Sequence, residues 1–91
     1  MARRWSLAVA ASAERTLARL PETAATAVVE FILGPLSESP KRVGHRLGRE
    51  LEGLWEARRG PYRIIYELDE ETRQVHVLRI EHGADVYRGT R

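Results

Sequence analysis

A predicted β-hairpin around Gly60-Pro61 constrains the fold of this chain more than any other feature. Two runs rich in strand-favouring residues, within the stretch LEGLWEARRGPYRIIY (51–66), flank this turn-forming pair. With the pair in the turn, the register sets four pairs of residues opposite each other: Arg59 with Tyr62, Arg58 with Arg63, Ala57 with Ile64 and Trp55 with Tyr66. One side of the hairpin then carries apolar groups, and the other carries two opposed guanidiniums.

The opposed guanidiniums of Arg58 and Arg63 need an explanation, because like charges directly across two strands destabilise a sheet. A bound anion would remove the conflict, since the planar guanidinium matches a phosphate and is always charged. The pair therefore indicates a polyanion site. The alternative is that each Arg pairs with a nearby carboxylate, such as Glu56 or Glu67, on a solvated face.

Length and composition predict one domain spanning residues 1–91, with 43% hydrophobic and 31% charged residues as in soluble globular proteins. The chain has no cysteine, which excludes disulfides, thiolate metal sites and a cysteine nucleophile. The longest apolar-rich run, Ala24–Leu33, is far shorter than the roughly 20 residues of a membrane span. No signal-peptide core follows Met1–Arg4. We therefore expect a cytoplasmic protein that does not contact a membrane.

Positive charge is concentrated in the middle of the chain, although the net charge is only +2. Residues 41–63 contain three glutamates and seven basic residues: Lys41, Arg42, Arg46, Arg49, Arg58, Arg59 and Arg63. Such a local excess attracts nucleic acid or another acidic partner.

Hydrophobic periodicity predicts an α+β fold. Alternation predicts a strand over Trp5–Val9, and helical spacing predicts a helix over Ser12–Leu20 with Ser12 as its N-cap. A second helix runs from Pro21 to about Leu33 and ends at Gly34-Pro35.

The rest of the chain reads as a loop over Ser37–Gly48, with a brief helical or extended turn near 46–51, followed by a three-stranded meander. After the hairpin we expect a turn over Glu67–Gln74 and a last strand from Val75 to Ile80. The order strand, helix, helix and three strands predicts two N-terminal helices on one face of a small, mainly antiparallel four-stranded sheet.

The histidines and one tyrosine are the remaining candidates for chemistry. His45, His76 and His82 lack the spacing of a metal-binding helix, so no metal site is expected. His76 reads as a cross-strand surface residue, whereas His45 and His82 could transfer a proton near neutral pH. Tyr87 could stack on a base or anchor the C-terminal segment. Three aromatic residues read as core or core-edge groups: Trp55, Tyr62 and Tyr66.

The sequence resembles the RelE/ParE superfamily of toxins from bacterial toxin–antitoxin pairs, within it the RelE and YoeB branches. Three stretches carry the resemblance: ASAERTLARLP, LEGLWEARRGPYRIIYELD and VHVLRIEHGADVYR. It implies a RelE-like fold and a ribosome-dependent endoribonuclease that cuts mRNA in the A site. It also implies a cognate antitoxin as partner, besides the ribosome and mRNA, and no cofactor.

Residue roles are carried over from the resemblance. Arg58 and Arg63 match basic residues that hold the scissile phosphate, and His82 matches a C-terminal catalytic His that would serve as the acid. Tyr87 matches a functional Tyr, and either His45 or Glu56 would be the base. Five further residues would contact RNA: Lys41, Arg42, Arg46, Arg49 and Arg59.

The chain departs from the family pattern at two places. Gly83 stands where many relatives have an Arg that assists the leaving group, so that Arg is either missing here or replaced by Arg79 or Arg88. His45 stands where the YoeB-like branch has its general base, a Glu, and the lysines of the RelE type are absent near Glu56.

The implied mechanism is metal-free transesterification by the 2′-hydroxyl. One alternative is a ParE-like inhibitor of DNA gyrase without nuclease activity, and another is a protein of this fold that only binds an antitoxin.

Overall fold

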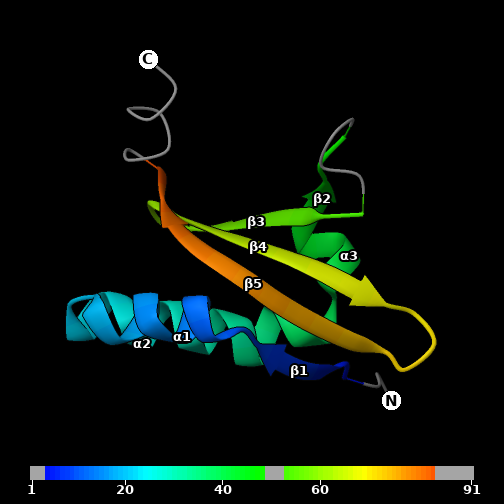
Figure 1. The fold of residues 1–91 in the computed structure, drawn as a ribbon, viewed down its shortest axis with the longest axis horizontal. Coiled ribbons are helices and arrows are strands. Elements are labelled where there is room, and N and C mark those ends of the chain that lie inside the picture. Colours follow the sequence, from blue (N-terminus) through cyan, green and yellow to red (C-terminus); the bar gives the residue numbers. More distant parts are fainter. Residues whose placement is uncertain (1–3, 49–52, 84–91) are drawn as a thin grey trace.

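A five-stranded mixed sheet with helices packed on one face forms the described part of the computed structural model, residues 4–48 and 53–83 (Figure 1). The elements are β1 (Ser6–Val9), α1 (Ala11–Arg19), α2 (Glu22–Phe31), the π-helical segment η1 (Ile32–Leu36), α3 (Pro40–Val43), β2 (Gly44–Arg46), β3 (Trp55–Arg59), β4 (Tyr62–Asp69) and β5 (Gln74–His82). The strand order is β1-β5-β4-β3-β2, and only β1, which lies alongside β5, is parallel to its neighbour within this part of the chain. The α+β class and the placement of the helices are confirmed.

The central hairpin has the predicted register. Arg58 lies opposite Arg63 and Trp55 opposite Tyr66. The other two predicted pairs, Ala57 with Ile64 and Arg59 with Tyr62, are also present. Gly60 has a positive φ of 60°, which glycine adopts without strain, and this allows the two-residue turn with Pro61. The two strands that flank the turn therefore pair in the register predicted from the sequence.

The fifth strand, β2, corrects the prediction of a four-stranded sheet and of a loop over Ser37–Gly48. Its three residues are too few to show alternation, so the sequence gives no strand signal there. They pair antiparallel with β3, which places Gly44 opposite Ala57. A Cβ on Gly44 would lie 2.0 Å from the Tyr66 hydroxyl and 2.6 Å from the Glu56 carbonyl oxygen. Only glycine fits at this approach.

Helix α1 begins one residue earlier than predicted, and Ser12 is not its N-cap. Ala10 holds the N-cap position, and its N–H donates to the Val77 carbonyl (2.8 Å). Ser12 lies inside the helix and its hydroxyl donates to the carbonyl of Leu78 (2.8 Å). The β4–β5 register skips Leu78, because Ile65 pairs with Arg79 and the next residue pairs with Val77. This bulge leaves the Leu78 carbonyl available to accept a hydrogen bond from Ser12 at the start of α1.

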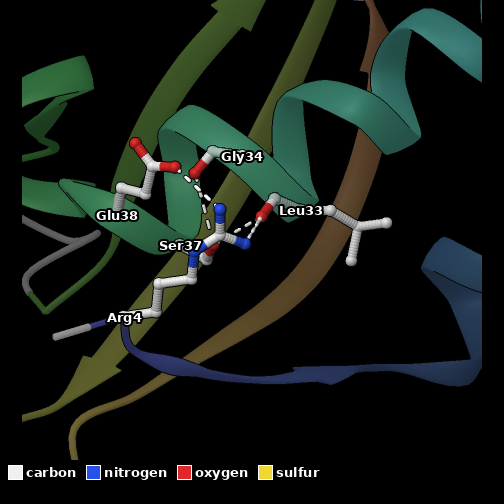
Figure 2. A network of polar contacts seen from close by, with 5 residues as sticks. All are labelled: Arg4, Leu33, Gly34, Ser37 and Glu38. Atoms are coloured by element: carbon white, nitrogen blue, oxygen red, sulfur yellow. Dashed lines mark hydrogen bonds and ion pairs between the residues drawn. The ribbon is translucent and has the colours of Figure 1, made fainter.

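The second helix does not end at Gly34-Pro35, as predicted, but continues as η1. Pro35 has no N–H to donate to a helical carbonyl, and a π-turn accommodates the changed bonding. Side chains complete it: the Arg4 guanidinium donates to the Leu33 carbonyl (3.1 Å) and contacts Glu38 (2.9 Å), as Figure 2 shows. The buried Ser37 hydroxyl also donates to Leu33 (2.7 Å).

The two long strands extend beyond their predicted ends. β4 continues to Asp69 and β5 runs from Gln74 to His82, so the turn is shorter than the predicted Glu67–Gln74. Polar residues occupy these strand ends because one side faces solvent. The turn is closed by the Asp69 carboxylate, which accepts the N–H groups of Glu71 (3.0 Å) and Thr72 (3.2 Å).

The apolar core lies between the helices and the sheet. Its buried members come from every layer: Trp5, Ala13, Val28, Ile32, Leu36, Ala57, Ile64, Tyr66, Val75, Val77 and Ile80. Trp55 stacks on Tyr66 with ring centroids 6.3 Å apart, and Tyr62 packs against the core from its edge. The prediction of these aromatics as core or core-edge residues is confirmed.

Candidate functional site

A charged face lies on the side of the sheet away from the helices. Because strand residues alternate between faces, burial of Ala57, Ile64 and Ile80 against the helices turns their neighbours to the opposite side. The side chains that form the charged face are His45, Glu56, Arg58, Arg63, Arg79 and Glu81. They come from four adjacent strands, β2 to β5.

Glu56 is the acid around which the charged face is arranged. Its side chain is only 6% exposed, and its Oε2 atom pairs with the Arg63 Nε and lies 3.8 Å from an Arg58 Nη2. Its Oε1 atom lies 3.3 Å from the Nε2 atom of His45. Glu56 therefore offsets the repulsion between the two guanidiniums. Glu67, the other predicted candidate, instead pairs with His76 (3.4 Å), which is a cross-strand surface residue as expected.

The two guanidiniums of the hairpin differ in access to solvent. The Arg58 side chain is 50% exposed, whereas that of Arg63 is 18% exposed. Arg63 is also 4.0 Å from the carboxylate of Glu81, which pairs in turn with Arg79. Arg58 is thus the guanidinium of the pair that is open to an external anion, while Arg63 is held behind it.

Glu81 is the member of the charged face that sequence reasoning missed. It lies directly opposite Arg63 across β4 and β5. A signal was available, because an acidic residue alternating with buried apolar ones marks a side chain on the same face as Arg63. The last strand was predicted to end at Ile80, so this position had no register.

His82 lies on the helix side of the sheet and not on the charged face. It ends β5 opposite Tyr62, and the two rings meet edge to face with centroids 5.3 Å apart. The chain then returns toward Arg58: the Gly83 N–H donates to the Pro61 carbonyl (2.7 Å), and a Cβ on Gly83 would lie 3.9 Å from an Arg58 Nη1. Tyr87 and Arg88 lie outside the described residues.

Four of the five basic residues predicted to contact RNA lie in the described part of the chain, where they are dispersed over the surface. Lys41 pairs with Glu70 (2.6 Å) and lies 5.9 Å from the centre of the Trp5 ring. Arg42 is exposed, and Arg46 lies 5.5 Å from the centre of the Trp55 ring. Arg59 lines an apolar groove of about 380 Å³ beside α2 and Tyr62, and Arg49 falls outside the described residues.

Tyr66 has a structural role and not a catalytic one. Its ring is fully buried, and its hydroxyl donates to the Pro40 carbonyl (2.7 Å). Burial disfavours the phenolate and raises the pKa of Tyr66 from 10.0 to about 12. The hydroxyl therefore ties α3 to the sheet beside β2.

Residues 4–48 and 53–83 contain neither a cluster of metal ligands nor a membrane-spanning helix. No three His, Asp or Glu side chains converge there in a way that could hold a metal ion. In the same residues, every helix is too short or too polar to cross a membrane.

Comparison with known proteins finds relatives over most of the chain. Residues 5–87 match the sequence family described as "ParE toxin of type II toxin-antitoxin system, parDE". The chain is 51% identical over 77 residues to "Toxin RelG" of Mycobacterium tuberculosis, covering 85% of this chain and 88% of that protein. It is 44% identical over 84 residues to "Toxin RelE" of the same organism, covering 92% and 87%.

Solved structures of toxins with related names are also similar to this chain. A chain of the toxin–antitoxin complex RelBE2 from M. tuberculosis superposes with a TM-score of 0.85 at 44% identity, covering 88% of this chain and 99% of that chain. The isolated E. coli RelE toxin superposes with a TM-score of 0.70 at 19% identity, covering 94% of each chain, which is a likeness of fold.

Proposed function

Because this chain belongs to the ParE toxin family of type II toxin–antitoxin systems, we propose that it is a ribosome-dependent endoribonuclease that cuts mRNA and so inhibits translation. The relatives of 44% and 51% identity are named RelE and RelG, which favours the RelE type of toxin. The observation that carries the proposal is the pair Arg58 and Arg63, opposed on one face of the sheet.

Arg58 is the proposed ligand of the scissile phosphate. Its guanidinium is half exposed, and Glu56, the acid with which it pairs among residues 4–48 and 53–83, is 3.8 Å away, which leaves donors for a phosphate. Arg63 adds positive charge from behind and is fixed by Glu56 and Glu81. Cationic groups placed before the reaction stabilise the charge that develops on a pentacovalent phosphorane.

The proposed reaction is a transesterification without a metal ion. The 2′-hydroxyl loses its proton to a base, and its oxygen attacks the adjacent phosphorus. The bond from phosphorus to the 5′-oxygen breaks, and that oxygen takes a proton from an acid. The products are a 2′,3′-cyclic phosphate and a 5′-hydroxyl. His45 or Glu56 is the proposed base, and both lie on the charged face beside the guanidiniums.

His82 is the proposed acid and Tyr87 the proposed group that orients or stacks a base. The ring of His82 packs against Tyr62 on the helix side of the sheet, so its role as acid rests on the resemblance, while the next residue, Gly83, approaches Arg58. Arg79 is the proposed replacement for the Arg that many relatives have at position 83, because it lies on the charged face. Lys41, Arg42, Arg46, Arg49 and Arg59 are proposed to contact RNA or the ribosome.

An antitoxin is the proposed protein partner. The similar chain of 44% identity comes from a toxin–antitoxin complex. An extended acidic segment would complement the basic side chains of the charged face, and its removal would expose Arg58 to RNA.

Mapping of mRNA 5′ ends in a translating extract tests the proposal. We expect new 5′-hydroxyl ends within translated codons when the toxin and ribosomes are both present, and none when ribosomes are removed. Intact mRNA in the complete extract would contradict the nuclease.

Inhibition of DNA gyrase is the second candidate function, and the family description, which names ParE, is the observation that favours it. A supercoiling assay separates the two. Loss of supercoiling by purified gyrase, with mRNA left intact in the extract, would establish the second candidate over the first.

A further inference from the structure

The last strand, β5, changes its alternation partway along its length because of the bulge at Leu78. In its first half the buried residues are Val75 and Val77, and in its second half the buried residue is Ile80. Ile80 follows Val77 by three residues, whereas regular alternation turns every second residue to the same face. Leu78 is the extra residue, which the β4–β5 register skips. The bulge therefore returns Ile80 to the apolar core.

The bulge also decides which side chains of β5 reach the charged face. Without the extra residue, the two faces would be exchanged: Ile80 would join the charged face, and Arg79 and Glu81 would turn toward the helices. With it, Glu81 lies opposite Arg63, 4.0 Å from one of its Nη1 contacts, and pairs with Arg79. Both ion pairs of Glu81 therefore depend on the bulged register.

The start of α1 holds the bulge from the other edge of β5. Strand β1 pairs with β5 as far as Val9 and Val77, and the next N–H, that of Ala10, donates to the Val77 carbonyl (2.8 Å). The Leu78 carbonyl lies past this last strand pair. It accepts a hydrogen bond from the Ser12 hydroxyl (2.8 Å), so a side chain of α1 takes the place of a strand partner.

Two residues of β5 could occupy the place opposite Ile65. In the structure Arg79 pairs with Ile65, and Leu78 is the extra residue. If Arg79 were the extra residue instead, Leu78 would take the paired place on the charged face, while the residues after Arg79 would keep their faces. Because the bond from Ser12 engages the Leu78 carbonyl in the bulged conformation, it favours the first arrangement over the second.

We propose that Ser12 is a positioning residue of the candidate site, because its hydroxyl keeps the bulge at Leu78. The bulge keeps Arg79 on the charged face, where it pairs with Glu81. Glu81 also lies 4.0 Å from Arg63, so the start of α1 acts on the guanidinium charge of the site. The effect on cleavage rests on the proposed function, whereas the effect on the strand register does not.

Amide hydrogen exchange tests the register without any activity. Ser12→Ala should speed exchange at the amides of residues 78–81 by about 3- to 10-fold, the effect of losing one hydrogen bond. Ser12→Thr keeps a hydroxyl and should exchange at the wild-type rate. Ser6→Ala is the matched control, because the Ser6 hydroxyl also donates to a distant carbonyl, that of Arg73 (3.3 Å), at the other end of β5. Unchanged exchange over residues 78–81 in Ser12→Ala would overturn the proposal.

Cleavage kinetics in the ribosome-containing extract test the consequence for the site. We expect Ser12→Ala to lower kcat by about 3- to 10-fold with KM little changed. Ser12→Thr and Ser6→Ala should both cut at the wild-type rate. Ser12→Ala and Arg79→Ala should have less than additive effects in the double variant, because the first acts through the side chain that the second removes. Fully additive effects would contradict a positioning role.

The outcomes keep this inference apart from the proposed function. If the wild type cuts mRNA and folded Ser12→Ala cuts equally well, the inference fails and the nuclease stands. If the wild type does not cut in the extract, the nuclease fails, and amide exchange still decides whether Ser12 holds the bulge. Faster exchange in Ser12→Ala alone supports that role, and equal exchange in Ser12→Ala and Ser6→Ala ends it.

Discussion

The two faces of the sheet are made by the same strands and have opposite chemistry. Toward the helices, β3, β4 and β5 present Ala57, Ile64, Tyr66 and Ile80, all buried in the apolar core. Toward the other side, the alternating residues are mainly charged. The difference follows from the two-residue period of a strand, so one hairpin register determines both the core and the candidate site.

Glu56 lies on the charged face and carries a charge, yet it is as buried as the residues of the apolar core. Burial of a carboxylate is unfavourable unless neighbouring cations compensate it, and here the Arg63 guanidinium does so, with His45 3.3 Å from the other carboxylate oxygen. The helix-covered face is therefore stabilised by apolar burial, whereas the charged face depends on one internal ion cluster. Substitutions on the two faces should therefore lower the free energy of unfolding for different physical reasons.

The largest expected effect on stability comes from breaking the internal ion cluster. Arg63→Ala leaves the buried Glu56 carboxylate without its main partner and should lower the free energy of unfolding by about 3–5 kcal/mol. Arg79→Ala, which removes a 66% exposed partner of Glu81, should lower it by less than about 1 kcal/mol. Urea denaturation measures both. Equal effects would show that burial does not distinguish these pairs.

Alkaline pH should weaken the helix-covered face through Tyr66. Its pKa is about 12 in the folded chain and 10.0 when exposed, so stability is full below pH 10 and falls as pH rises through 12. The two-unit difference corresponds to about 2–3 kcal/mol. Tyr66→Phe should remove this component of the pH dependence, which urea titrations at pH 9 and 11.5 would detect. An identical fall in the variant would place the effect elsewhere.

A methyl group at Gly44 should disturb the close contact between β2 and the buried Tyr66. Gly44→Ala places a Cβ 2.0 Å from the Tyr66 hydroxyl, so β2 must shift, at a cost of about 1–3 kcal/mol. Gly48→Ala is the matched control, because nothing lies within 4 Å of its added Cβ. Thermal unfolding of the two variants compares them, and equal midpoints would contradict the close approach.

The smallest effect is expected at the solvated ion pair between Lys41 and Glu70. Both side chains are more than half exposed, so Lys41→Ala should lower the free energy of unfolding by less than about 1 kcal/mol. The effect should vanish in 1 M salt, which screens exposed charges. A loss above 2 kcal/mol would mean that the Lys41 stem packs on Trp5 more strongly than the geometry indicates.

The hairpin register could be predicted from sequence because turn residues and strand alternation act over a few positions. Gly60-Pro61 set the turn, and Arg58 opposite Arg63 followed from it. The strand β2 could not be predicted, because three residues show no period and pair only where β3 offers an edge. The cap of α1 was missed because Ser12 bonds to a carbonyl exposed by a bulge 66 residues away.

The candidate site was partly predictable for the same reason. Residues on the hairpin could be assigned to one face, whereas the His45–Glu56 contact depends on β2, which no local pattern indicated. The sequence also offered two solutions to the repulsion between Arg58 and Arg63, a phosphate or an internal acid. The structure supplies the acid, Glu56, and still leaves Arg58 half exposed.

The most direct test of the nuclease proposal is cleavage by Arg58→Ala, measured by mRNA end mapping in the ribosome-containing extract. Because Arg58 is half exposed, its loss should change the free energy of unfolding by less than about 1 kcal/mol. Loss of a stabilising group on the phosphorane should lower cleavage about 100-fold or more. Arg15→Ala on α1, which is also exposed, should cut at the wild-type rate. Wild-type cleavage by folded Arg58→Ala would contradict the account.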